Sequence, residues 1–253
     1  MKALRSSVSS LLYYGAKRFG YLDLGTRILC YHRVNDEKTD YLSVPSARFR
    51  EQMKFLRTEG YKSIGLGELL SGSTNGKNVV ITFDDGYLDN YENAFPIMRE
   101  YGFSGTIFCI GNKLGERSYL SKDQIREMGR EGFEFGSHTL SHRDLPGLNL
   151  TEKRREIGES KSFLENELGE RIAFFCYPRG LYDSETVELV KKAGYLAACS
   201  NRPGSNDVAN GMNPYLLKRT EIAPHDSLDD FKKKLAGAYD LLHVTLHWAR
   251  GKP

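Results

Sequence analysis

The sequence predicts an α/β fold, a distorted or incomplete (β/α) barrel with parallel strands. Short apolar runs alternate with helical patterns of 11 to 18 residues, the arrangement of repeated β-α-β units. Several apolar runs lack polar alternation, as expected for strands that are covered on both faces. Six or seven such units in about 225 residues fit a barrel better than a small open sheet.

Each element is indicated by its own local pattern. The apolar, β-like runs predict strands at 27–32, 61–64, 79–83, 106–110, 133–136, 172–177 and 195–200. Between and after them, the sequence predicts helices at 46–59, 87–101, 121–131, 151–168, 183–193 and 227–242. Ser46 and Ser121 are the expected N-caps, and five of the helices stop at a glycine, which readily adopts the left-handed conformation. Segment 201–214 is rich in Asn, Gly and Pro and is expected to form a long surface loop.

Composition excludes several classes of protein. The 253 residues carry 36 Lys and Arg against 33 Asp and Glu, a balance that argues against a nucleic-acid partner. The four cysteines lie in apolar runs without a CxxC pair, so buried thiols are expected rather than a zinc knuckle or a disulfide framework.

The N-terminal segment 1–24 is predicted to be an amphipathic helix, followed by one catalytic barrel domain at 25–253. The helix could pack on the barrel or lie on an anionic membrane surface. Its apolar centre is interrupted by Ser9 and Ser10, which argues against a signal peptide, and no apolar run approaches the roughly 20 residues of a membrane span. A cytoplasmic or peripheral-membrane location is therefore expected.

Polar residues with catalytic potential follow several of the expected strands. Asp84 and Asp85 close the run 79–83, and a cation is needed if two adjacent carboxylates are to stay ionised. His138 and His142 have the i, i+4 spacing that lets two imidazoles on a helical turn bind one metal. The alternatives are a helix-capping turn for the aspartates and a chance spacing for the histidines. One carboxylate with two imidazoles would leave an open coordination position, as in hydrolytic metal sites.

Two further strand ends open onto the same expected cleft. Pro178 and Gly180 force a tight turn that can direct backbone N–H groups inward, although a plain turn with Asp183 as the helix cap is the alternative. His32 closes the first strand, where a lone histidine can also be a simple rim residue. Lys218 and Arg219 could end a further strand and reach the cleft.

Three motifs, in this order and spacing, resemble those of the polysaccharide deacetylase superfamily, carbohydrate esterase family 4. They are TFDDG at 82–86, HTLSH at 138–142 and YPRGLYD at 177–183. The opening YHRV at 31–34 is similar to the branch that deacetylates poly-N-acetylglucosamine, in which the catalytic histidine lies near the N-terminus. The resemblance runs from about residue 27 to about residue 242. It implies a distorted (β/α) barrel, a divalent metal, usually zinc, and hydrolysis of N-acetyl or O-acetyl groups on glycans.

The resemblance also implies roles for the matching residues. Asp84 corresponds to the general base, Asp85, His138 and His142 to the metal ligands, and His32 to the general acid. A backbone N–H near the third motif is expected to receive the oxyanion.

The sequence departs from the family pattern in the third motif. Cys176 stands where many members have the arginine that holds the base, and Arg179 or Arg219 could substitute for it. Arg179 also replaces a common aromatic residue, and we expect it to belong to the catalytic set. His247 is a competing acid, but Trp248 stands where the family has an aspartate. The expected substrate contacts around the cleft are Tyr87, Tyr177, Pro178 and Arg219.

These observations predict a metal-dependent hydrolase that removes N-acetyl groups from an acetamido-sugar polysaccharide, with zinc as the expected ion. One alternative is a deformylase or deacetylase of a lipid-linked sugar, which would suit peripheral membrane contact through residues 1–24. The other is a catalytically inactive glycan-binding barrel.

Overall fold

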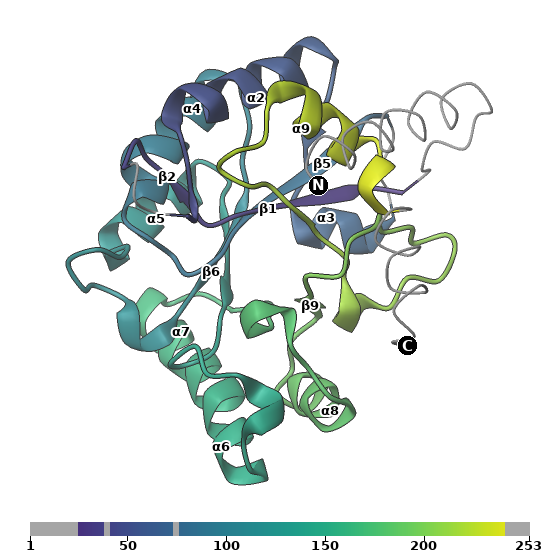
Figure 1. Ribbon diagram of the computed structural model, residues 1–253. Helices are drawn as coiled ribbons and strands as arrows, with labels where there is room; N and C mark the ends of the chain where they lie inside the picture. The colour runs from purple at the N-terminus through teal and green to yellow at the C-terminus, as the bar shows by residue number, and fades with distance from the viewer. Residues whose placement is uncertain (1–24, 38–40, 73–75, 241–253) are drawn as a thin grey trace.

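The computed structural model shows a curled sheet of parallel strands with helices packed around it (Figure 1). The structure describes residues 25–37, 41–72 and 76–240. In the view of Figure 1, helices α2, α4 and α9 lie on one side of the strands, and α6, α7 and α8 lie on the opposite side. The predicted distorted α/β barrel is confirmed.

The main sheet has the strand order β10-β1-β5-β6-β7-β8-β9, with β4 also paired to β5, and all these pairs are parallel. The carboxyl ends of its strands therefore lie at one end of the barrel, which is where parallel α/β folds place their chemistry. The strands are β1 Arg27–Tyr31, β4 Lys62–Ser63, β5 Asn78–Phe83, β6 Thr106–Cys109, β7 Glu134–Ser137, β8 Phe174–Cys176, β9 Ala197–Cys199 and β10 Thr220–Glu221.

The two edges of this sheet are joined by a short stretch of chain before and within β10. Leu217 forms a parallel bridge with Cys199 at the end of β9, and Thr220 then pairs with Leu29 of β1. The backbone N–H of Arg219 also donates to the carbonyl of Arg202, at 2.9 Å. The sheet thus curls into a barrel whose closure depends on these few contacts.

The helices follow the predicted order but include breaks that the sequence did not indicate. They are α2 Ser46–Thr58, α3 Leu66–Ser71, α4 Phe95–Glu100, α5 Lys122–Arg130, α6 Leu150–Arg154, α7 Ser160–Leu168, α8 Ser184–Lys192 and α9 Leu228–Leu235. The expected helix 87–101 is a π-helical turn, Asn90–Ala94, that continues into α4, and 151–168 is likewise interrupted by the π-helical turn Arg155–Glu159. The five glycines expected to end helices, Gly60, Gly102, Gly132, Gly169 and Gly194, all have positive φ.

Several smaller expectations are corrected by the structure. Ser121 caps α5 as predicted, but Pro45 occupies the N-cap of α2 and Ser46 is already inside that helix. The expected helix 227–242 is interrupted, because α9 ends at Leu235 and Gly237 has a φ of 79°, and residues 238–240 are helical again. Helix α3 and the two-residue strands β2 Arg33–Val34 and β3 Ser43–Val44, which pair with each other, were not predicted.

Two apolar clusters reflect the alternation of side chains along the strands. The smaller cluster, which includes Ile28, Val80 and Phe108, gathers residues from five strands of the main sheet. The larger one includes Leu29, Ile81 and Ile107, the neighbours of those residues, and packs them against the helices. All four cysteines are free and buried, as expected.

Part of the sequence-based interpretation falls on residues that the structure does not describe. These are the expected helix at 1–24, with its membrane contact, and the candidate acid His247. Among the described residues, no helix has the length and apolar character needed to cross a bilayer.

Candidate metal centre and active site

The aspartate pair lies where β5 ends, and the local backbone separates the two carboxylates. Asp84 continues the strand, with its N–H donating to the carbonyl of Tyr31 at 2.9 Å. Asp85 then adopts a φ of 73°, and Gly86 follows with a φ of 75°. A side chain at Gly86 would meet Cys109, whose Sγ would lie 3.1 Å from an added Cβ, so this tight turn requires glycine.

Asp85 turns towards two histidines that follow β7. Its Oδ1 lies 3.6 Å from Nε2 of His138 and 3.5 Å from Nε2 of His142. His138 is 1% exposed, and its Nδ1 is 2.8 Å from the carbonyl oxygen of Cys176. That hydrogen bond orients the ring so that Nε2 faces Asp85. A metal-binding histidine usually makes such a hydrogen bond through its other ring nitrogen.

The two histidines do not lie on a helical turn, which corrects that part of the expectation. Thr139 and His142 have φ values of 68° and 60°, so the segment folds back in a tight non-helical turn. The N–H of His142 donates to Oγ1 of Thr139 at 2.9 Å, and the N–H of Thr139 donates to Oγ of Ser137 at 3.2 Å. The side chains of this motif therefore stabilise the turn that brings the imidazoles together.

The residues present fit a divalent metal at this point. Asp85, His138 and His142 can each offer one ligand atom, and these atoms lie within 4.8 Å of one another. Oδ1 of Asp85 is buried and has no hydrogen-bond partner in the described part of the chain, a costly arrangement unless a cation completes it. Burial lowers the pKa of His138, which favours the neutral imidazole that metals require. One carboxylate with two imidazoles suits zinc.

A second cluster of potential ligands, Asp84, His138 and Cys176, fits a metal less well. Burial raises the pKa of the Cys176 thiol well above its usual value, although the charge of Arg219 opposes the shift. Both carboxylate oxygens of Asp84 already accept hydrogen bonds from Arg219. The cluster of Asp85, His138 and His142 is therefore the better candidate for a metal site.

Asp84 is held by a buried arginine from the other end of the sequence. Nη1 and Nη2 of Arg219 donate to the two oxygens of Asp84 at 2.6 and 2.7 Å. The side chains are 0% and 2% exposed. Burial raises the pKa of Asp84, but the charges of Arg219 and His138 and the hydrogen bonds from Arg219 together outweigh it and keep that pKa below its usual range. The carboxylate is therefore anionic and fixed in orientation.

Arg219 is itself fixed by its surroundings. It donates to the carbonyl of Ser200 at 3.0 Å and to Oδ1 of Asn201 at 2.5 Å, and Nη2 lies 3.1 Å from Sγ of Cys176. Of the two arginines considered as holders of the base, the structure places Arg219 in that position. Because it is buried and its donors are engaged, it is not the substrate contact that the sequence suggested.

The turn Pro178–Gly180 places the side chain of Arg179 away from the site. Arg179 has a φ of 54°, and its 69% exposed side chain lies 3.3 Å from Asp144 on the surface. What this residue can offer the site is its backbone N–H, which donates to no backbone oxygen among the described residues. Asp183 caps α8 through a hydrogen bond from the N–H of Thr186.

Two of the expected substrate contacts are buried instead. Tyr177 is fully buried, and its hydroxyl donates to the carbonyl of Tyr215 at 3.1 Å. Pro178 is buried beside it. Tyr87 is partly exposed and stacks on Tyr119 with ring centroids 5.1 Å apart, and burial and then the charge of Asp85 raise its pKa. Of this group, Tyr87 keeps a position at the rim.

His32 follows β1 and is held through its backbone. Its carbonyl accepts a hydrogen bond from Nδ2 of Asn90 at 2.8 Å. The neighbouring Asp89, which is 6% exposed, accepts from Nε of Arg33 at 2.7 Å and from the N–H of Val34 at 3.2 Å. His32 lies directly after Tyr31, whose carbonyl accepts the hydrogen bond from the N–H of Asp84.

Sequence reasoning did not single out Asp89 and Asn90, which hydrogen-bond the segment that carries His32. Both lie in the stretch that directly follows the aspartate motif, and the π-helical turn Asn90–Ala94 presents them to the segment that carries His32. π-Helical turns occur frequently at functional sites. The signal in the sequence was the acidic and amide run at 89–93 immediately after a catalytic motif.

Comparison with known proteins agrees with this geometry. A family model for polysaccharide deacetylases matches residues 71–198. A Bacillus subtilis protein assigned to the polysaccharide deacetylases, YxkH, is 35% identical over 202 residues, which cover 78% of this chain and 71% of that protein. The poly-β-1,6-N-acetyl-D-glucosamine N-deacetylase of Staphylococcus aureus is 28% identical over 264 residues, or 96% of this chain and 86% of that one.

A solved structure has the same fold. The Streptococcus pyogenes deacetylase PplD in complex with acetate superposes with a TM-score of 0.77 and 26% identity, covering 84% of this chain and 99% of that one. The family model spans the aspartate, histidine and Pro178–Gly180 motifs, and the curated relatives extend over most of the chain. The chain belongs to the polysaccharide deacetylase family.

Proposed function

We propose that this chain removes N-acetyl groups from the amino sugars of an acetylated glycan, with poly-N-acetylglucosamine as the model substrate. The observation that carries the proposal is the division of the aspartate pair. Arg219 holds Asp84 as an oriented anion, while Asp85 has an unpartnered oxygen facing His138 and His142. A glycan-binding barrel has no need for a fixed base beside a metal site.

We propose zinc as the ion that Asp85, His138 and His142 hold. When bound, such an ion would position the attacking water and polarise the acetyl carbonyl. The carboxylate of Asp84 is the group that accepts a proton from water. Its fixed orientation keeps an oxygen directed at the reaction centre, while Arg219 prevents it from turning away.

The other two roles belong to groups at neighbouring strand ends. We propose that His32 donates a proton to the departing amine, because histidine transfers protons effectively near neutral pH. The backbone N–H of Arg179 is the proposed donor to the oxyanion. The support for both is positional: β1 and β8 end at the same end of the barrel as β5 and β7. Tyr87 is the proposed aromatic contact with the sugar.

The proposal is tested by incubating the metal-loaded chain with acetylated glucosamine oligosaccharides and following acetyl loss by mass spectrometry. Asp84→Asn keeps the shape of the side chain but removes the proton acceptor, so turnover should fall by at least about 10²-fold. Metal content, measured by atomic emission on the same samples, should stay the same. Full turnover in Asp84→Asn would contradict the base assignment, and loss of the metal would mean that the two aspartates exchange roles.

The membrane contact of residues 1–24 remains a prediction from the sequence. It would bring the chain close to a glycan at a membrane surface, and Lys2, Arg5, Lys17 and Arg18 provide the basic side chains that it requires.

A further inference from the structure

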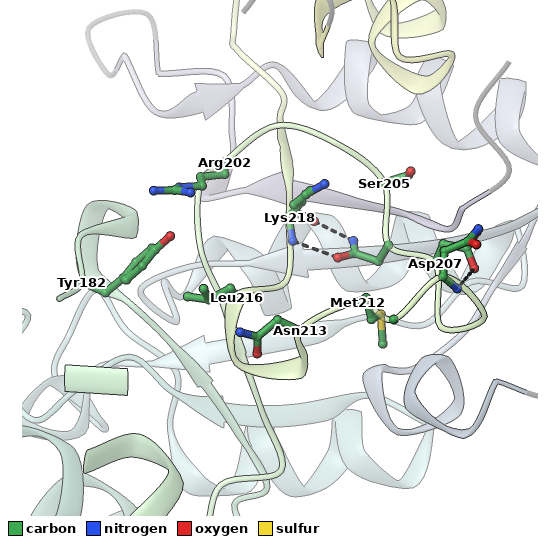
Figure 2. A pocket seen from close by; sticks show the side chains of 11 residues that line it. Tyr182, Arg202, Ser205, Asp207, Met212, Asn213, Leu216 and Lys218 are labelled. Atoms are coloured by element: carbon green, nitrogen blue, oxygen red, sulfur yellow. Dashed lines mark hydrogen bonds between the residues drawn. The ribbon is translucent and has the colours of Figure 1, made fainter. Parts of the chain in front are cut away.

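A polar pocket outside the candidate site includes Arg202 and Lys218, the chain neighbours of Asn201 and Arg219. It has a volume of about 440 Å³ and is formed by Tyr182 and by the chain between residues 202 and 218 (Figure 2). This volume falls in the range of small-molecule binding sites, about 300–1,000 Å³. Nothing in the proposed reaction uses these residues.

The lining carries an excess of positive charge. Arg202 and Lys218 are exposed, and neither forms an ion pair with a carboxylate in the described part of the chain. The acidic residue of the lining, Asp207, is engaged by Asn210, whose N–H and Nδ2 donate to its two oxygens at 3.2 and 2.5 Å. Among the residues that the structure describes, the two cations therefore have no carboxylate partner and can take up an anion.

The backbone around these cations is held in place. The side chain of Asn206 is buried and bridges the backbone of Lys218, accepting from its N–H at 2.9 Å and donating to its carbonyl at 2.8 Å (Figure 2). An added Cβ at Gly204 would lie 2.5 Å from Cδ of Lys218, so this glycine makes room for the lysine stem. The guanidinium of Arg202 lies over the ring of Tyr182, 5.4 Å from its centroid. These contacts pre-organise the pocket and lower the cost of binding.

The pocket is connected to the catalytic base by short hydrogen-bonded steps. Lys218 precedes Arg219, and Arg202 follows Asn201, which accepts from the same guanidinium that holds Asp84. The N–H of Arg219 donates to the carbonyl of Arg202. The backbone of 201–202 and 218–219 therefore links the pocket to the arginine that holds Asp84.

We propose that the pocket binds an anionic substituent, phosphoryl or carboxylate, of the acetylated sugar ligand. Planar guanidinium groups and ammonium groups both form charge-assisted hydrogen bonds with such oxygens. The inference rests on the proposed function, because it assigns the substrate to acetylated glycans that carry negative charge.

The test compares the affinities of the full chain for N-acetylglucosamine, N-acetylglucosamine 6-phosphate and N-acetylmuramic acid by titration calorimetry. At least one anionic sugar should bind about 10-fold more tightly than the neutral one, as expected for one new charge-assisted contact. The stronger of the two arms identifies the substituent as phosphoryl or carboxylate. The preference should shrink as sodium chloride is added, because salt screens exposed charges.

Single variants locate the effect. Arg202→Gln and Lys218→Gln should each reduce the ratio of anionic to neutral affinity by about 5-fold or more. Lys192→Gln, at the exposed end of α8, removes the same charge elsewhere and should leave the ratio unchanged. Because the readout is a ratio, partial loss of folded protein does not imitate the effect, and each single variant is informative without the other.

The outcome is separable from that of the proposed function. Equal affinity for neutral and anionic sugars, or an unchanged ratio in both Arg202→Gln and Lys218→Gln, would overturn the pocket assignment even if acetate is released. A charge-dependent affinity without acetate release from any sugar would retain the pocket and reject the hydrolase.

Discussion

Replacing Arg219 by methionine should separate the orientation of the base from the rest of the site. Methionine fills a similar volume but removes both hydrogen bonds to Asp84, at 2.6 and 2.7 Å, and leaves a carboxylate that is 2% exposed without its counter-charge. The metal ligands keep their own contacts, because Arg219 touches none of them in the described residues. Turnover should therefore fall by at least about 10²-fold, as for loss of a general base, with metal content retained.

The cost in stability follows from the burial of the pair. Removing one partner of a buried ion pair costs about 3–5 kcal/mol, and two charge-assisted hydrogen bonds give a similar range. Native domains have a free energy of unfolding of about 5–15 kcal/mol, so the variant should fold with a reduced margin. For a chain of this size, the loss corresponds to a fall in melting temperature of about 6–20 °C.

The assay is urea unfolding followed by circular dichroism, in the presence of a chelator so that metal binding does not contribute. Arg219→Met, Asp84→Asn and the double variant complete a double-mutant cycle. Because the penalty arises from an uncompensated charge, the double variant should recover at least half of the stability lost in Arg219→Met. Its activity should remain low.

Two results would refute this reasoning. If Arg219→Met lowers the free energy of unfolding by less than about 1 kcal/mol, the pair is not the buried interaction that the structure shows. If the free energy of unfolding lost in the double variant equals the sum of the losses in the two single variants, Arg219 stabilises the barrel through contacts other than Asp84.

The remaining predictions concern the other groups of the site. His138→Ala should remove most of the bound metal, measured by atomic emission, and full occupancy would contradict the ligand assignment. His32→Ala should lower the rate of amide hydrolysis by at least about 10²-fold. The loss with an aryl acetate should be much smaller, because a phenolate leaves without protonation. If His32→Ala keeps full amidase activity and His247→Ala loses it, the general acid is His247. Asn90→Ala removes the hydrogen bond to the carbonyl of His32 and should lower amide hydrolysis by about 10-fold, with a smaller loss on the aryl acetate and unchanged metal content. Equal losses on both substrates would limit Asn90 to a structural role.

The barrel could be predicted because its units carry strong local signals. Apolar runs without alternation identify strands covered on both faces, and a glycine after each of five helices identifies where the chain turns back. The elements that were missed are short. Strands β2 and β3 have two residues each, and β2 owes its position to the contacts of Arg33 and Val34 with Asp89 rather than to any periodic pattern.

The proposed metal ligands were easier to find in the sequence than the residues that support them. Asp85, His138 and His142 belong to compact motifs at strand ends, and parallel strands bring such ends together. Arg219 is separated from Asp84 by 135 residues, and its side chain reaches the base only because the chain around 217–221 joins the two edges of the sheet. No spacing in the sequence encodes that closure. The burial of Tyr177 likewise depends on which face of the barrel its side chain takes.

Backbone conformation at the site has a consequence for protein engineering. In the described residues, the non-glycine residues with positive φ are Asp85, Thr139, His142 and Arg179, and all four lie in the three motifs of the site. Each such residue costs about 1–2 kcal/mol, so together they consume a large share of a normal folding margin. Selection for thermostability alone would therefore favour glycine or asparagine at Asp85 and His142 and remove two of the proposed metal ligands, whereas glycine at Arg179 would keep the backbone N–H that is proposed to act there.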